Sequence, residues 1–135
     1  MSPADFAGVW QVGRIITDRL AGQVGRFDGQ AVLSAAGTDL TYEEAGRLQM
    51  GQGAVMTATR RYHWAFRDGL VVVTFADHGP FHSFQPGVSG AGTDHSCGSD
   101  LYRVKYGFSE WPVWTAVWQV SGPRKEYSLD SRYWR

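Results

Sequence analysis

The chain has 135 residues, of which 13 are Lys or Arg and 13 are Asp or Glu, so its formal net charge is zero. That length corresponds to one domain, which we expect to span residues 1–135. With balanced charge, the chain has neither the excess of basic residues typical of nucleic-acid-binding proteins nor a polybasic segment of the kind that binds membrane surfaces. The longest apolar run, 70–76, is too short to cross a bilayer. We therefore expect neither nucleic acid nor a membrane as a partner.

The number of cysteines indicates the cellular compartment in which the protein is expected. Cys97 is the only cysteine, so the chain cannot form an internal disulfide. Small secreted domains are usually rich in disulfides, so one cysteine favours a reducing compartment. The opening residues MSPADFAGVW also lack the basic and apolar regions of a secretory signal. These features together predict a cytoplasmic protein.

The dominant pattern along the chain is an alternation of apolar and polar residues, interrupted by turn residues every eight to fifteen positions. The 17 Gly and the aromatic content of 14% also favour strands and turns. Asp68-Gly69 is the strongest hairpin signal, because Gly tolerates the positive φ of a tight turn. The expected strands are 9–17, 31–35 (beginning within 25–29), 40–48, 56–66, 70–75, 81–85, 95–108, 114–120 and 125–134.

These segments amount to about eight to ten consecutive strands, and no segment has the pattern of an amphipathic helix of normal length. Successive strands joined by short connections protect their edges best by closing on themselves. We therefore predict an all-β fold, a single antiparallel up-and-down β-barrel of the lipocalin-like kind. A barrel of this size can hold one small ligand.

The segment Gly8-Val9-Trp10 resembles the Gly-x-Trp opening of lipocalin and fatty-acid-binding-type barrels. This resemblance implies that Trp10 closes the barrel floor and that a late arginine, here Arg124, packs over it. The 122–127 segment and four other motifs resemble a family of small, functionally uncharacterised bacterial and fungal lipocalin-like domains: Tyr42-x-Glu44-x-Gly46-x-Leu48, Arg61-Tyr62-x-Trp64, Phe81-His82 and His95-x-Cys97-x-x-Asp100-x-Tyr102. The resemblance implies a barrel with a central cavity and carries over no established activity.

A polar cluster falls within the expected strand 95–108. His95 and Cys97 share one face of that strand, whereas Asp100 and Tyr102 have the opposite parity. A bulge at Gly98-Ser99 would shift the parity by one residue and turn all four side chains inward. Asp100 could then orient His95 as a general acid or base, while Tyr102 stabilises developing negative charge. The alternative is a cluster at the barrel rim that is held by local hydrogen bonds.

Arg60 shares the apolar face of segment 56–66 with Tyr62 and Trp64, so we expect it to point inward. A buried arginine needs an anionic or carbonyl partner, because an unpaired charge is costly in a low-dielectric interior. Glu44, on the same face as Tyr42, could be that partner in a structural pair. Alternatively, the planar guanidinium could clamp a carboxylate or enolate ligand.

Ligand pockets are typically apolar and aromatic, with a few convergent polar groups. We expect His82 to lie at the barrel mouth. The spacing of His82, His95 and Cys97 is unusual for zinc, and no motif demands haem, so we predict no metal and no cofactor. The expected ligand-binding residues are Tyr42, Arg60, Tyr62, Trp64, His82, Trp118 and Arg124.

The sequence leaves two functional hypotheses. The first is intracellular binding of a small apolar or aromatic ligand, which could be anionic, in the barrel cavity. The second is a cofactor-independent isomerase, cyclase or hydratase that uses His95 and Asp100 as an acid–base pair, helped by Tyr102. Motifs of common enzyme classes are absent, which favours binding. Such a barrel could also form a homodimer.

Overall fold

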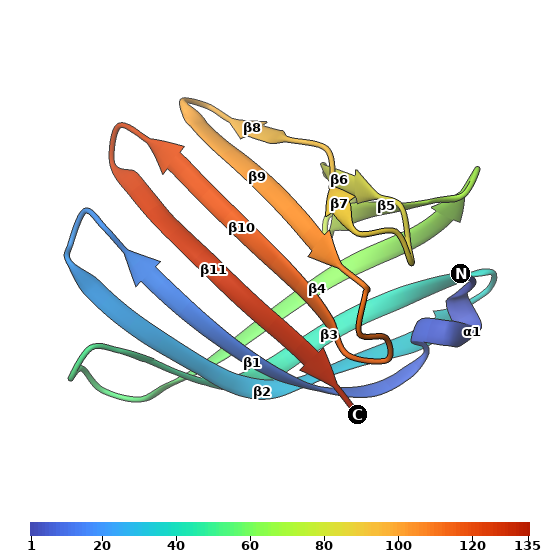
Figure 1. The fold of residues 1–135 in the computed structure, drawn as a ribbon, viewed down its shortest axis with the longest axis horizontal. Coiled ribbons are helices and arrows are strands. Elements are labelled where there is room, and N and C mark those ends of the chain that lie inside the picture. The colour runs from blue at the N-terminus through green and yellow to red at the C-terminus, as the bar shows by residue number, and fades with distance from the viewer.

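The computed structural model describes all 135 residues as one sheet of antiparallel strands and one short helix (Figure 1). The helix α1 spans Pro3–Phe6. The strands are β1 (Gly8–Asp18), β2 (Gln23–Ala36), β3 (Asp39–Met50), β4 (Met56–Arg67), β5 (Leu70–Phe75), β6 (Pro80–Phe84), β7 (Gly90–Ala91), β8 (His95–Cys97), β9 (Asp100–Gly107), β10 (Trp114–Gly122) and β11 (Lys125–Trp134).

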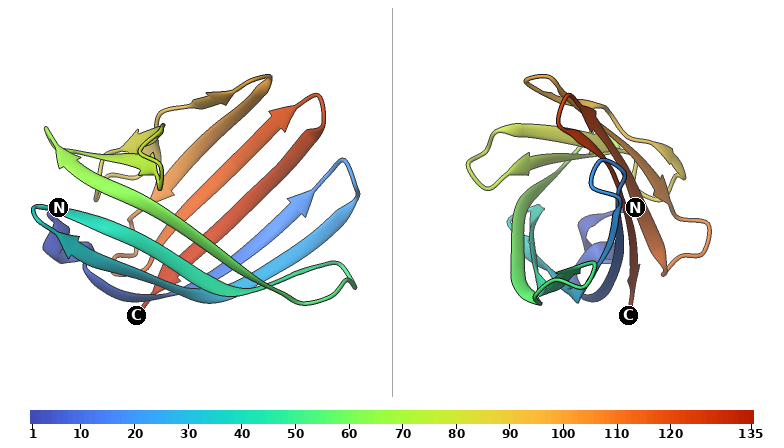
Figure 2. Two further views of the ribbon diagram at one scale, coloured as in Figure 1. Left: turned by 180° about the vertical axis from the view of Figure 1, so that it is seen from behind. Right: turned by 90° about the vertical axis from the view of Figure 1, so that its left-hand side faces the viewer.

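The strands are ordered β6-β5-β4-β3-β2-β1-β11-β10-β9-β7, and β8 also pairs with β9. The segment between β7 and β8 brings the two ends of the sheet together. Gly92 donates its backbone N–H to Val104 of β9 at 3.1 Å, and Thr93 donates to Ser83 of β6 at 2.9 Å. The result is the nearly closed barrel seen end-on in the right panel of Figure 2. The prediction of an all-β, antiparallel up-and-down barrel is confirmed, although the sheet has 11 strands, one more than the upper end of the expected range.

Strand alternation selects the residues that face the interior. Along β3, for example, Leu40, Tyr42 and Glu44 are buried, whereas their immediate neighbours are more exposed. The Asp68-Gly69 hairpin forms as expected, because both residues adopt positive φ, 52° and 77°. On β3 and at this hairpin, the alternation and the turn chemistry place the side chains and the turn where the sequence predicts them.

One end of the barrel is filled by aromatic side chains. Phe6, the last residue of α1, is fully buried and packs edge-on against Trp64, Trp111 and Trp114. Trp10 is also fully buried and donates its Nε1–H to the Phe6 carbonyl at 2.9 Å. The expected role of Trp10 at the barrel floor matches this position.

The arginine that covers Trp10 differs from the expected one. The Arg135 guanidinium lies 3.9 Å from the centroid of the Trp10 ring and also donates to the carbonyls of Ala7 and Asp5. Arg124 instead occupies the exposed turn between β10 and β11, at the other end of these strands. The prediction for Arg124 was wrong because strand β11 carries the chain back to the closed end, so that Arg135, which directly follows β11, lies beside Trp10.

A close approach of two strands shapes the wall near the cavity. Gly29 of β2 and Gly46 of β3 are paired directly across the sheet. A Cβ atom on Gly46 would overlap the Asp28 carbonyl oxygen and crowd the Phe27 ring. Glycine therefore leaves room for the Phe27 ring over this pair, and the Arg14 guanidinium lies 5.1 Å above that ring.

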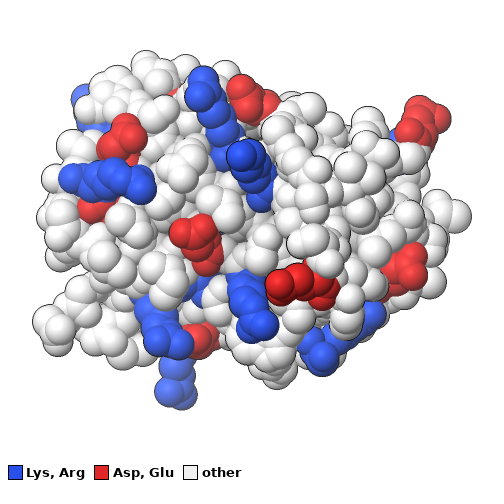
Figure 3. Space-filling view, viewed as in Figure 1, with Lys and Arg blue, Asp and Glu red and all other residues white.

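On the outer surface, acidic and basic side chains are interspersed, as the face shown in Figure 3 illustrates. No helix in the structure has the length and apolar character needed to cross a membrane.

Candidate binding cavity

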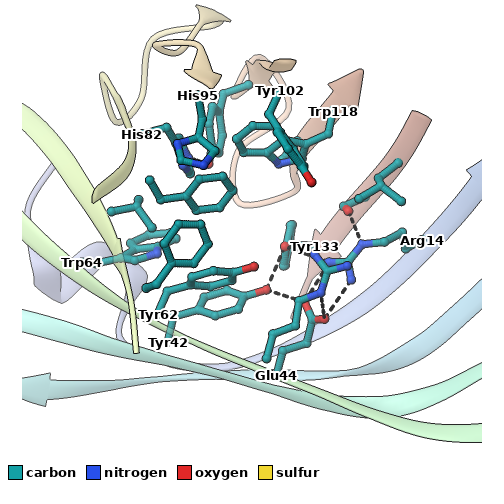
Figure 4. A pocket seen from close by; sticks show the side chains of 18 of the residues that line it. Arg14, Tyr42, Glu44, Tyr62, Trp64, His82, His95, Tyr102, Trp118 and Tyr133 are labelled. Atoms are coloured by element: carbon teal, nitrogen blue, oxygen red, sulfur yellow. Dashed lines mark hydrogen bonds and ion pairs between the residues drawn. The ribbon is translucent and has the colours of Figure 1, made fainter. Parts of the chain in front are cut away.

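The barrel encloses a cavity of about 300 Å³, lined by 21 residues of which 15 are hydrophobic (Figure 4). Eight of the ten side chains expected at a site line this cavity, whereas Asp100 and Arg124 do not. The ones that line it are Tyr42, Arg60, Tyr62, Trp64, His82, His95, Tyr102 and Trp118, together with Arg14, Glu44 and Tyr133.

The upper part of the wall is a stack of aromatic rings. The Phe81 ring lies nearly parallel to the rings of Trp118 and Phe75, with centroid separations of 4.9 and 4.5 Å. The Tyr62 ring also lies roughly parallel to the Phe81 ring, with a centroid separation of 5.5 Å. Such parallel faces favour planar aromatic partners, which gain contact area and offset stacking at the same time.

The opposite part of the cavity is polar and centres on a buried ion pair, drawn with dashed lines in Figure 4. Arg14 on β1 donates to both carboxylate oxygens of Glu44 on β3, at 2.8 and 2.7 Å. The Arg14 Nε–H also donates to Ser131 Oγ at 2.6 Å. The exposed fractions of the two charged side chains are 6% and 2%, so the pair is shielded from solvent screening.

Two tyrosine hydroxyls extend this network in a fixed direction. The Glu44 carboxylate can only accept, so the Tyr42 hydroxyl donates its single proton to Glu44 Oε1 at 2.6 Å. Tyr42 therefore accepts from the Tyr133 hydroxyl, which lies 2.8 Å away. The proton order is Tyr133 to Tyr42 to Glu44. Both hydroxyl protons are committed within the protein, so neither is left to bind an anion.

The electrostatics of this cluster keep both charges in place. Burial by itself raises the pKa of Glu44, but the hydrogen bonds and charge of Arg14 outweigh it and hold that pKa below its usual value. Burial works against the charge of Arg14 as well, yet its pKa is raised because Glu44 accepts its hydrogen bonds. Together the two side chains add no net charge to the cavity.

From the sequence we considered Arg60 as the partner of Glu44 and did not identify Arg14. In the structure Arg14 holds Glu44 directly, while the Arg60 Nε lies 4.0 Å from Glu44 Oε2 at the margin of the pair. Arg14 shares its inward parity with Trp10 and Val12, which are both buried on β1. That alternation was the signal that could have found it.

Arg60 lies where the cavity meets solvent. β5 pairs with β4 only from Tyr62 onward, so the Met56–Arg61 half of β4 has no strand partner on that side. Arg60 is in this half, lines the cavity and has a side chain that is 43% exposed. Arg14 is neutralised by Glu44, whereas Arg60 makes only a long contact of 4.0 Å with the same carboxylate and faces the cavity from its solvent side.

His82 sits deep in the aromatic half of the cavity, and its side chain is 8% exposed. Its Nε2 is 2.8 Å from the Tyr106 hydroxyl, while its Nδ1 is buried and has no hydrogen-bond partner. Burial, reinforced by the nearby His95, lowers the pKa of His82 to about 3. The ring is therefore neutral at physiological pH. The expectation of a histidine at the barrel mouth is not met, because His82 lies inside the wall.

The His95 cluster is assembled by a hairpin and not by the expected bulge. Gly98 has φ of 59°, and it turns the chain so that His95 pairs with Tyr102 and Cys97 with Asp100. Paired residues share a face, so the four side chains do lie on one side of the hairpin. The bulge prediction was wrong because a glycine with positive φ serves a tight turn equally well.

The expected acid–base pair does not form within this cluster. The Asp100 carboxylate is 3.0 Å from the Lys125 ammonium, which also donates to the Tyr102 hydroxyl at 3.2 Å. His95 instead packs against the rings of Phe81, Phe75 and Tyr102. Asp100 therefore forms an ion pair with Lys125, and His95 packs in the aromatic wall of the cavity.

Comparison with known proteins extends this description. A family model described as a family of unknown function, DUF6314, matches residues 6–135. The chain belongs to the DUF6314 family. No curated protein matches this DUF6314 chain. A crystal structure from Nostoc punctiforme, a protein of unknown function from the DUF3598 family, is similar in fold with a TM-score of 0.64. The two are 9% identical, and the match covers 98% of this chain but 48% of the Nostoc chain, so the DUF6314 chain spans about half its length.

Proposed function

We propose that the barrel binds a small, flat, aromatic molecule that carries one anionic group. The observation that carries the proposal is the combination of the parallel ring stack around Phe81 with the half-exposed cation Arg60 in one cavity. Planar apolar surface of the ligand would pack against these rings, while the anion would face Arg60 at the solvent side. A volume of about 300 Å³ is at the lower end for ligand pockets, which suits a molecule of two fused rings.

The charge balance inside the cavity supports an anionic ligand. The guanidinium of Arg14 donates its hydrogen bonds to Glu44 and Ser131, and the Tyr42 hydroxyl also donates to Glu44. Arg60 keeps donors available for a partner, since its distance to Glu44 is 4.0 Å. A carboxylate at Arg60 would form charge-assisted hydrogen bonds, which are stronger than those between neutral groups.

Two features support the finer assignment of the barrel to the lipocalin-like kind. Trp10 in the Gly8-Val9-Trp10 motif is buried at the closed end, and Arg135 covers its ring. The proposed compartment is intracellular, because the single thiol, Cys97, is free and exposed. Binding is proposed ahead of acid–base catalysis because Asp100 pairs with Lys125 and leaves His95 without an orienting carboxylate.

A fluorescence titration tests the proposal. 2-Naphthoate and its neutral isostere 2-naphthamide would be titrated into the wild-type protein, with quenching of Trp emission as the signal. We expect 2-naphthoate to bind at one site and more tightly than 2-naphthamide. Arg60→Gln should weaken 2-naphthoate about tenfold or more, since a hydrogen bond to a charged group contributes roughly 1.5–3 kcal/mol.

The neighbouring Arg61 provides a matched control. Arg61 lies on the outer face of β4 and faces Glu43 at 3.6 Å, so Arg61→Gln removes the same charge from the same strand outside the cavity. It should leave the affinity for 2-naphthoate unchanged. Equal effects of the two substitutions, or no binding of either probe, would reject the proposal.

A further inference from the structure

Two buried nitrogen atoms in the aromatic half of the cavity have no hydrogen-bond partner. They are His82 Nδ1 and Trp114 Nε1, and both side chains line the cavity. Buried polar atoms in folded proteins are nearly always paired, so each exception calls for a partner. Trp114 Nε1 carries a hydrogen and can only donate.

The bond between His82 and Tyr106 indicates which hydrogen His82 carries. The Tyr106 hydroxyl is buried, and burial raises its pKa well above the usual value, so it keeps its proton. A phenol is the better donor and an imidazole nitrogen the better acceptor, so the 2.8 Å bond is O–H to Nε2. Because His82 is neutral, its single hydrogen then resides on Nδ1. His82, like Trp114, therefore presents an N–H donor without an acceptor.

Neither protein nor solvent readily supplies that acceptor. The rings around His82 are those of Phe81, Phe84 and Trp118, at centroid separations of 4.5, 6.1 and 4.7 Å. A buried water needs two to four polar partners, and these three rings offer none that accept a conventional hydrogen bond. The polar cluster of Arg14 and Glu44 lies across the cavity, as Figure 4 shows.

We infer that the ligand carries a neutral hydrogen-bond acceptor, such as a ring carbonyl, at the end that enters the aromatic half, where Trp114 Nε1–H and His82 Nδ1–H would donate to it. This inference rests on the proposed function and specifies the ligand further. The molecule would be an aromatic acid with an anion toward Arg60 and an acceptor at its buried end. A purely hydrocarbon ring system would leave both donors unpaired, which is costly in such a site.

A pair of probes of nearly equal shape tests the inference. Chromone-7-carboxylate carries a ring carbonyl on the ring remote from its carboxylate, whereas 2-naphthoate has no such acceptor, and both carry the same carboxylate. We expect chromone-7-carboxylate to bind the wild-type protein roughly threefold to tenfold more tightly, the contribution of a neutral hydrogen bond. His82→Phe and Trp114→Phe should each reduce that preference, measured as the ratio of the two affinities in the same variant. Circular dichroism would establish that each variant folds, and either folded variant suffices.

The tautomer of His82 can be measured without any ligand. In protein labelled with ¹⁵N-histidine, long-range ¹⁵N–¹H correlation spectra at neutral pH should show the Nδ1–H form for His82, with His82→Phe assigning the signal. Observation of the Nε2–H form would overturn the role of His82. Equal affinity of the wild-type protein for the two probes would overturn the inference and leave the proposed function intact. Failure of both probes to bind would overturn both.

Discussion

The guanidinium of Arg14 and the carboxylate of Glu44 face each other across the barrel interior and share two hydrogen bonds of 2.8 and 2.7 Å. Thirty residues separate them in sequence, and neither side chain is more than 6% exposed. The pair removes its own charge from the cavity and fixes the hydroxyls of Tyr42 and Tyr133. An anion that enters the barrel would therefore meet Arg60 as its available cation.

Removing one partner of this pair should be far more harmful than removing both. Glu44→Gln leaves the Arg14 charge buried and should lower the free energy of unfolding by about 3–5 kcal/mol. The double variant Arg14→Met/Glu44→Leu should lose less than Glu44→Gln alone, because no charge remains unpaired. Urea denaturation at neutral pH measures both. Asp28→Asn, which breaks the exposed pair with Arg26, is the control and should change stability by less than about 1 kcal/mol. A double variant as unstable as Glu44→Gln would contradict this view of the pair.

Arg135 should stabilise the closed end of the barrel, whereas Arg124 should not. Arg135→Ala removes the contact with the Trp10 ring and two hydrogen bonds to backbone carbonyls, so we expect a loss of about 1–2 kcal/mol. Arg124→Ala alters an exposed turn and should have an effect within about 0.5 kcal/mol. Thermal unfolding followed by circular dichroism would compare them. The reverse order would restore Arg124 as the covering residue.

The buried His82 should make the protein sensitive to mild acid. The pKa of His82 in the folded protein is about 3, below its ordinary value of 6.5. Between these two pH values the unfolded chain binds a proton at His82 and the folded protein does not. The free energy of unfolding should therefore fall as the pH decreases from 6.5 toward 3. Between pH 7 and pH 5 this contribution amounts to about 2 kcal/mol.

The variant His82→Phe isolates this effect. It removes the titrating group, so its stability should decline between pH 7 and pH 5 by about 2 kcal/mol less than that of the wild type. The range from pH 5 to pH 7 lies above the ordinary glutamate pKa of 4.5, so protonation of Glu44 contributes little to the change in stability. Urea denaturation at several pH values provides the measurement. Parallel pH profiles for the two proteins would show that His82 titrates normally in the folded state.

The Gly29–Gly46 contact should resist substitution. In Gly46→Ala the new methyl group would overlap the Asp28 carbonyl oxygen and the Phe27 ring, so β2 and β3 must separate. We expect a loss of about 1–3 kcal/mol, as for other overpacked sites. Gly13→Ala places a methyl group at ordinary contact distance from Trp134 and serves as the control. Equal midpoints of thermal unfolding for the two variants would mean that the approach of these strands imposes no constraint.

Local patterns were sufficient for the fold and for much of the cavity wall. Alternation alone turned Tyr42, Tyr62 and Trp64 inward, because a strand has only two faces. Arg14 has the same inward parity, but its pairing with Glu44 depends on how β1 and β3 lie across the barrel, which no local pattern specifies.

The remaining differences have similar physical origins. Gly98 was correctly recognised as a special position, yet a bulge and a tight turn both use a glycine of positive φ, and only the register of β8 against β9 separates them. Arg135 covers Trp10 because β11 ends beside that ring. The order of Arg124 and Arg135 in the sequence does not indicate which of them reaches Trp10. Long-range geometry was the missing information in each case.

The most direct test of the cavity as a binding site is to fill it. Ala116 lies between Trp114 and Trp118 on the inward face of β10, and its small side chain leaves part of the cavity open. Isothermal titration calorimetry should show one molecule of 2-naphthoate bound per wild-type chain, and no detectable binding to a folded Ala116→Phe variant. Equal affinity for the two proteins, or no binding to the wild type, would contradict the assignment of the barrel interior as a ligand site.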